Sequence, residues 1–136
     1  MNTIPVVAAV IQRGDRFLLG MRPRHKRHGG QWEFPGGKLG PHEEAADGLS
    51  RELAEELALE VVRVGEVLWE SRDPGADFVI AFYEVEVEGE ARALEHERIG
   101  WFTAGELEEM PLAPADAAFV RRAAILGSNP PPRPDA

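Results

Sequence analysis

The stretch that decides the fold is residues 37–59, which read GKLGPHEEAADGLSRELAEELAL. Its first part contains glycine and proline and predicts a turn. Its second part repeats apolar residues at steps of three and four, the period of one helix face. The members of this stripe are Ala45, Ala46, Leu49, Leu53 and Leu57. We therefore predict a turn followed by a helix over about residues 42–57, with one apolar side against a core.

Acidic side chains crowd the second half of this predicted helix. Glu52 and Glu56 are four residues apart and lie one above the other, and Glu55 flanks them. Like charges at this spacing repel each other. A divalent cation such as Mg²⁺ or Mn²⁺ would offset that repulsion, because these ions take carboxylate and water oxygens as ligands. A solvated acidic helix face is the alternative interpretation of the same residues.

Apolar runs on either side of this helix predict strands. Residues 4–11 are almost continuously apolar and rich in β-branched side chains, which is typical of a strand buried on both faces. After a turn at Gly14, we expect residues 16–21 to return as the second strand of a hairpin. The other expected elements are a short extended segment at 31–34, strands at 61–70, 78–87 and 98–102, a short helix after Thr103 and a final helix at 115–126. Together they predict an α+β fold, a sandwich whose mixed sheet lies between the middle and last helices.

The length of 136 residues corresponds to a single domain. We expect this domain at residues 1–127 and a disordered tail at 128–136, because SNPPPRPDA is rich in proline and lacks apolar side chains. No stretch reaches the roughly 20 apolar residues of a membrane span, so we expect no membrane role. The chain has no cysteine. That absence excludes disulfides, thiolate zinc sites and cysteine nucleophiles, and it fits a cytoplasmic location.

The chain is acidic, with 15 Lys and Arg against 24 Asp and Glu and a net charge of −9. A charge of this sign repels the phosphates of duplex nucleic acid, so we expect no such partner. It would also repel a free anionic substrate unless a metal ion mediates the contact. The sequence does not indicate an oligomeric state.

The central stretch resembles the signature of the Nudix hydrolases, G-x5-E-x7-R-E-U-x-E-E-x-G-U, in which U is apolar. The matching positions are Gly37, Glu43, Arg51, Glu52, Leu53, Glu55, Glu56 and Leu59. Ala58 stands where the signature has glycine. Glycine at that position usually lets the chain leave the helix with a positive φ, so the departure concerns the end of the helix and leaves the carboxylates in place.

Three further segments resemble the MutT-type branch of that family. They are QWEFPGGK at 31–38, Glu95-His96 ahead of Trp101, and PLAPAD at 111–116. The resemblance covers about residues 4–126. It implies a Nudix-type α/β/α sandwich that hydrolyses (d)NTPs to a nucleoside monophosphate and pyrophosphate, with Mg²⁺ or Mn²⁺ as cofactor. The implied role is cleaning of the nucleotide pool, which is a DNA-repair function.

The resemblance also implies roles for residues near the phosphates. Glu52, Glu55, Glu56 and the backbone carbonyl of Gly36 are implied to hold metal ions that neutralise the triphosphate and acidify the attacking water. Arg51 is implied to orient these carboxylates by ion pairing. Glu95 is a candidate general base or additional metal ligand. Glu43 is either a further ligand or a favourable charge at a helix N-terminus.

Substrate contacts are implied for Arg22, Phe34 and Asp116. Arg22 opens a basic loop that also contains Arg24, Lys26 and Arg27. Phe34 is expected to wall the base pocket, with Trp32 in the core or at the rim. Asp116 is expected to read the base edge, in an oxidised purine such as 8-oxo-dGTP or in CTP and dCTP.

Two alternative functions remain at this stage. One is hydrolysis of another nucleoside diphosphate derivative, such as a nucleotide sugar or a dinucleoside polyphosphate. The other is a Nudix domain that binds and senses a nucleotide without hydrolysing it. The intact acidic residues Glu52, Glu55 and Glu56 disfavour the sensor, because a pure binder does not need three repelling carboxylates.

Overall fold

The computed structural model describes residues 3–72 and 77–127 of the chain. The tail expected at 128–136 lies outside the described residues. In chain order the elements are β1 (Ile4–Val10), β2 (Gln12–Arg13), β3 (Arg16–Met21), β4 (Trp32–Glu33), β5 (Gly36–Lys38), α1 (Ala45–Leu57), β6 (Glu60–Ser71), β7 (Phe78–Glu88), β8 (Arg98–Thr103), α2 (Ala104–Glu109) and α3 (Pro114–Gly127). No helix in these ranges is long and apolar enough to cross a bilayer.

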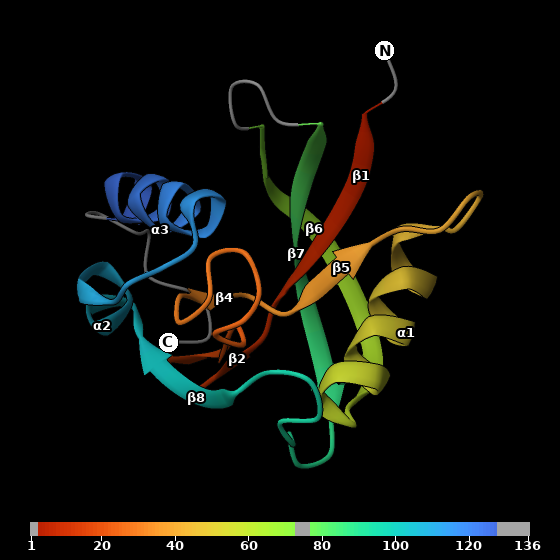
Figure 1. Cartoon of the computed structure of the whole chain (residues 1–136), viewed down its shortest axis with the longest axis horizontal. Coiled ribbons are helices and arrows are strands. Elements are labelled where there is room, and N and C mark those ends of the chain that lie inside the picture. Colours follow the sequence, from red (N-terminus) through yellow and green to blue (C-terminus); the bar gives the residue numbers. More distant parts are fainter. Residues whose placement is uncertain (1–2, 73–76, 128–136) are drawn as a thin grey trace.

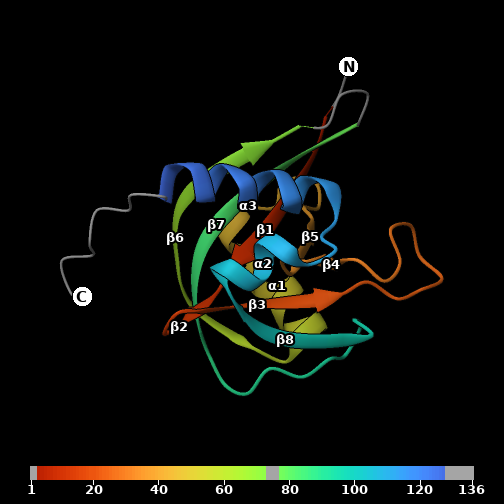
Figure 2. The same ribbon diagram turned by 90° about the vertical axis from the view of Figure 1, so that its left-hand side faces the viewer.

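The strands form two sheets. The first has the order β5-β1-β7-β6 and is mixed, since β1 runs parallel to β7 and its other pairs are antiparallel. The second is antiparallel and joins β3 to β2, β4 and β8. Helix α1 lies on one side of the first sheet, and α3 lies on the other (Figures 1 and 2). The expected α+β sandwich with a mixed sheet is confirmed.

Strand β1 carries the core on both of its faces. Val7 and Ala9 belong to a cluster that packs against α1, whereas Ala8 and Val10 belong to a second cluster that includes Phe119 of α3. Side chains alternate along a strand, so a strand between two helical layers needs apolar residues at every position. The prediction that residues 4–11 are buried on both faces is confirmed from Val7 onward.

The hairpin differs from the expected one. Strand β1 continues between β5 and β7, and the short strand β2 pairs with β3 instead, around the turn at Gly14. A strand that is apolar on both faces is best buried in the middle of a sheet that has helices on both sides. Strand β5 was also not expected, because its glycines predict a turn rather than an extended pair with β1.

Helix α1 begins later than predicted, at Ala45. The preceding residues form a loop in which His42 has a φ of 62° and Glu43 Oε1 accepts a hydrogen bond from the Gly40 N–H at 2.8 Å. Glu43 is therefore a loop residue. It directly precedes Glu44, the N-cap of α1, and its Oε1 atom would lie 3.3 Å from a Cβ on Gly48 in the first turn of the helix.

Ala58 ends helix α1 in the left-handed conformation, with φ 58° and ψ 32°. Its N–H donates to the Ala54 carbonyl at 3.1 Å, and the Leu59 N–H donates to the Leu53 carbonyl at 3.2 Å. This is the reversal for which the family signature has glycine. An alanine Cβ is strained in that conformation, so the chain turns here at an energetic cost.

Replacing Ala58 by glycine should stabilise the protein. We expect Ala58→Gly to raise the free energy of unfolding by about 0.5–1 kcal/mol, since the relief of left-handed strain exceeds the entropy that glycine adds to the unfolded chain. Chemical denaturation with circular dichroism measures this. Ala54→Gly is the matched control, because Ala54 is exposed inside the same helix. This variant should have a free energy of unfolding lower by about 0.5–1 kcal/mol. A loss in both variants would contradict the strain argument.

Candidate active site

Gly37 of β5 lets helix α1 approach the sheet, and Gly36 lets β5 lie close to β1. A Cβ on Gly36 would overlap the Val7 carbonyl, and a Cβ on Gly37 would lie 2.5 Å from the Glu52 carboxyl group. The carboxylates of α1 therefore lie directly against the backbone of β5. Larger residues at either position would push the helix or the neighbouring strand away.

Arg51 is hydrogen-bonded to carboxylates near the contact between α1 and β5. Its guanidinium donates to both oxygens of Glu43 at 2.9 Å and to Glu52 at 2.9 Å. Glu55 Oε1 lies 3.5 Å from Nη1 of Arg51, and the Glu55 side chain is half exposed. The hydrogen bonds from Arg51, with that from the Gly40 N–H, lower the pKa of Glu43 to about 2. Arg51 thus fixes the carboxylate of Glu52 beside β5.

Glu56 is the buried carboxyl group of the set. Burial raises its pKa, and the neighbouring Glu52 raises it further, while the Gly36 backbone N–H acts in the opposite direction. Its Oε1 atom is buried and has no hydrogen-bond partner in the described part of the chain. A buried acid beside a second acid, with one oxygen unpaired, is costly unless a cation or proton is shared between them.

These features fit a divalent cation. An unpaired carboxylate oxygen beside a second carboxylate supplies the hard oxygen ligands that Mg²⁺ and Mn²⁺ prefer. Within residues 3–72 and 77–127, no three His, Asp or Glu side chains are already grouped as a complete metal site. The structure brings Glu52 and Glu56 together, whereas Glu55 turns toward Arg51.

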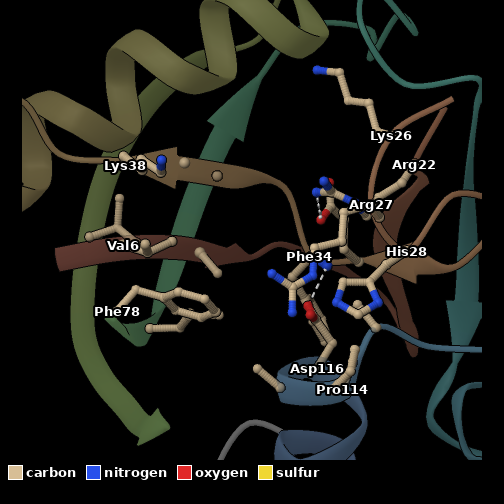
Figure 3. A pocket seen from close by; sticks show the side chains of 18 of the residues that line it. Val6, Arg22, Lys26, Arg27, His28, Phe34, Lys38, Phe78, Pro114 and Asp116 are labelled. Carbon is tan, nitrogen blue, oxygen red and sulfur yellow. Dashed lines mark hydrogen bonds and ion pairs between the residues drawn. The ribbon is translucent and has the colours of Figure 1, made fainter. Parts of the chain in front are cut away.

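A cavity of about 730 Å³ opens beside Glu56. Gly36 and Glu56 line one part of it, and Glu95 also lines it. In Figure 3, Arg22, Lys26, Arg27 and His28 lie on one side, Val6, Phe78 and Lys38 lie on the other, and Asp116 lies near Phe34 between them. The cavity therefore connects an acidic edge, a basic loop and an apolar wall.

Asp116 lines this cavity and is hydrogen-bonded to the backbone of Phe34. The Phe34 N–H donates to Asp116 Oδ1 at 2.8 Å. Burial raises the pKa of Asp116 to about 8, which favours the protonated carboxyl group at neutral pH. A neutral carboxyl group donates one hydrogen bond and accepts others. Phe34 lines the cavity but is also packed edge-on against Phe82 and Phe119 in the core.

Arg22 lies in the cavity wall as part of a chain of polar contacts that the sequence did not predict. Its guanidinium donates to Glu33 at 2.9 Å and to the Arg27 carbonyl at 2.7 Å. The other oxygen of Glu33 lies 3.0 Å from Nε2 of His96. Burial raises the pKa of Glu33, but the hydrogen bonds from His96 and Arg22 outweigh it and lower that pKa overall.

The remaining sequence candidates are distributed around this cavity. Trp32 is buried and packs edge-on against Phe102, as expected for a core or rim residue. Arg24 forms an exposed ion pair with Glu97 and does not line the cavity. Glu33 was not among the sequence candidates, and strand alternation does not reveal it, because Glu33 and its neighbour Phe34 both line the cavity.

Comparisons with known proteins identify the family. The NUDIX domain model matches residues 2–123. The chain is 39% identical to the CTP pyrophosphohydrolase of Escherichia coli over 119 residues, which are 85% of this chain and 87% of that protein. It is 38% identical, over 85% of this chain and 84% of the relative, to a Mycobacterium tuberculosis protein with 8-oxo-dGTP diphosphatase in its name.

Solved structures agree with this result. The solution structure of the E. coli ORF135 protein superposes with a TM-score of 0.81 and 36% identity, covering 96% of this chain and 95% of that one. The crystal structure of a MutT NUDIX hydrolase from Burkholderia pseudomallei superposes with a TM-score of 0.78 and 29% identity, covering 89% and 98%. The glycine-lined approach of β5 to the α1 carboxylates is thus the setting of the signature recognised in residues 37–59, and the chain belongs to the Nudix family.

Proposed function

We propose that this protein hydrolyses nucleoside triphosphates to a nucleoside monophosphate and pyrophosphate, with Mg²⁺ or Mn²⁺ as cofactor, and so removes damaged nucleotides from the pool. The observation that carries the proposal is the single cavity joining Glu56 and Gly36 to Phe34 and Asp116. Its volume of about 730 Å³ is that of a ligand site. The names of the two curated relatives support the same substrate class.

The phosphate end of the substrate belongs at the acidic edge. Glu52, Glu55, Glu56 and the Gly36 carbonyl would hold the metal, and Arg51 keeps Glu52 in place. When bound, the metal offsets phosphate charge and lowers the pKa of a water nucleophile. Arg22, Lys26 and Arg27 line the same cavity and offer cationic groups to the outer phosphate oxygens. These cationic groups offset the repulsion between an anionic substrate and a chain whose net charge is −9.

The base end belongs between the apolar wall and Asp116. Phe34 and Phe78 line this part of the cavity and supply apolar surface for a flat ring. In its protonated form, Asp116 offers both a donor and an acceptor to a base edge. We propose 8-oxo-dGTP and CTP as the candidate substrates, because these are the triphosphates in the names of the two curated relatives.

Glu95 is proposed as the general base or an additional metal ligand. It lines the cavity from an exposed loop position, and no group in the described ranges pairs with its carboxylate. A carboxylate without an internal partner can accept a proton or a cation from the cavity.

Removing the charge of Glu56 should abolish turnover without unfolding the protein. We expect Glu56→Gln to lower kcat by about 100-fold or more, because it removes a proposed ligand of a metal that contributes several kcal/mol. A pyrophosphate-release assay with Mg²⁺ and with EDTA measures this. Thermal stability should not fall, since a buried carboxyl group with a raised pKa is replaced by a neutral amide of similar size.

Glu44→Gln is the control for this experiment, because Glu44 is exposed next to the same helix and makes no side-chain cap. Its turnover should match that of the wild type. Hydrolysis that survives both Glu56→Gln and EDTA would contradict the proposed mechanism.

Asp116 should determine the choice of base. In Asp116→Ala we expect the ratio of kcat/KM between the best and a poor base to fall by about 10- to 100-fold, because a mismatched edge no longer leaves a buried polar group unpaired. Asp116→Asn keeps an acceptor for the Phe34 N–H and a donor for the base, and should retain the preference at pH 7. The assay compares 8-oxo-dGTP, dGTP, CTP and dCTP.

Equal losses on every triphosphate in Asp116→Ala would make Asp116 purely structural. A higher kcat/KM on ADP-ribose or a dinucleoside polyphosphate than on any triphosphate would assign the protein to the alternative substrate class.

A further inference from the structure

The segment between β7 and β8 is tied to two separate elements near the cavity. The N–H groups of Arg92 and Leu94 donate to the carbonyls of Leu57 and Glu56, at 2.9 and 3.0 Å. These carbonyls belong to the last turn of α1, which has no partners for them within the helix. Beyond this point, the Glu97 N–H donates to the Met21 carbonyl at the end of β3, at 3.0 Å. Figure 1 shows this segment in teal passing from β7 to β8.

His96 is the buried side chain of this segment. Its ring is 4% exposed and lies over Gly20 of β3, where a Cβ would come within 2.5 Å of the ring. Gly20 therefore provides the space that the ring fills. The imidazole is packed against the strand, although the residues on either side of it are exposed.

Glu33 fixes the orientation of that ring. Its pKa is lowered, so it is a carboxylate and can only accept hydrogen bonds. His96 must therefore donate from Nε2 across the 3.0 Å contact. Arg22 donates to the second oxygen of Glu33 and holds the acceptor in position. The buried Nδ1 of His96 has no partner in the described ranges, so the contact with Glu33 determines the direction of the ring.

Glu95 lies between these two attachments. The Leu94 N–H is bonded to α1 on one side of it, and the His96 ring is bonded to Glu33 on the other. Glu95 lines the cavity, and its carboxylate has no partner in the described ranges. The attachments on either side are therefore what limits where this exposed carboxylate can lie. Without the His96 contact, Glu95 would be restrained only by the Leu94 bond to α1 and the Glu97 bond to the Met21 carbonyl.

We propose that His96, held by Glu33, is a positioning residue that places Glu95 in the cavity for hydrolysis. This inference rests on the proposed function. Neither His96 nor Glu33 needs to touch the reacting atoms, because their effect passes through the backbone of residue 95. A displacement of about 1 Å at a reacting group can cost a hundredfold in rate, so a lost attachment should be visible in kcat.

The test compares two variants of His96 whose side-chain amides differ in length. In His96→Gln the amide nitrogen can take the place of Nε2 and donate to Glu33, whereas in His96→Asn it is too short to do so. We expect His96→Asn to lower kcat by about 10- to 100-fold with KM changed by less than about threefold. His96→Gln should stay within about threefold of the wild type. Leu94→Ala, which truncates an exposed side chain of the same loop, should leave kcat unchanged.

A double-mutant cycle identifies the residue through which His96 acts. In a Glu95→Gln background, His96→Asn should lower kcat by less than about twofold, because the carboxylate that His96 positions is already absent. Equal factors in both backgrounds, or no loss in His96→Asn, would overturn the inference. If the wild-type protein hydrolyses no triphosphate, both the proposed function and this inference are overturned. If the wild type is active but His96→Asn lowers kcat by the same factor with and without Glu95→Gln, only this inference is overturned.

Amide hydrogen exchange on the metal-free protein gives a readout independent of turnover. The Leu94 and Glu97 amides should exchange about tenfold faster in His96→Asn than in His96→Gln, because the loop opens more often when the ring contact is lost. Amides of Leu53 in α1 and Val85 in β7 should be equal in the two variants, which shows that both are folded. Equal exchange at Leu94 and Glu97 would contradict the anchoring role of His96.

Discussion

Arg51 lies within 3.5 Å of three carboxylates, that of Glu43 in the loop before α1 and those of Glu52 and Glu55 on α1 itself. A helix with this charge pattern repels itself, and a guanidinium that donates to several carboxylates at once offsets that repulsion. The compensation does not extend to Glu56, which is buried against β5 with one oxygen unpaired. The carboxyl group without a cationic partner therefore lies where α1, β5 and the cavity meet. The geometry of the site follows from that arrangement.

The two apolar faces of β1 explain why the cavity lies where it does. One face packs on α1, which carries the carboxylates, and the other packs toward α3, which carries Asp116. A single central strand therefore fixes the distance between the acidic edge and the residue proposed to read the base. Both ends of the cavity depend on the same close packing, so a change of volume in β1 would be felt at both.

The sequence by itself determined the elements and the chemistry of the central stretch. The apolar repeat from Ala45 to Leu57 indicates a helix, and its agreement with the family signature indicates the carboxylate-bearing edge. The almost continuous apolar run of residues 4–11 indicates a strand buried on both faces. These conclusions hold because each depends on a local repeat, and the repeat of side-chain directions is fixed by the backbone of a helix or strand. The position of Ala58 in the signature likewise indicated where the helix ends.

Only the tertiary structure decided which distant residues meet. The glycines of residues 36 and 37 predict a turn by composition, but they form a strand because β1 offers a partner and Glu52 needs the space of an absent Cβ. Glu33 and His96 are 63 positions apart, and no local pattern relates them. The raised pKa of Asp116 also depends on burial by segments that are far away in the chain. Contacts of this kind follow from how layers pack, and a local repeat in one segment carries no information about the side chains of another.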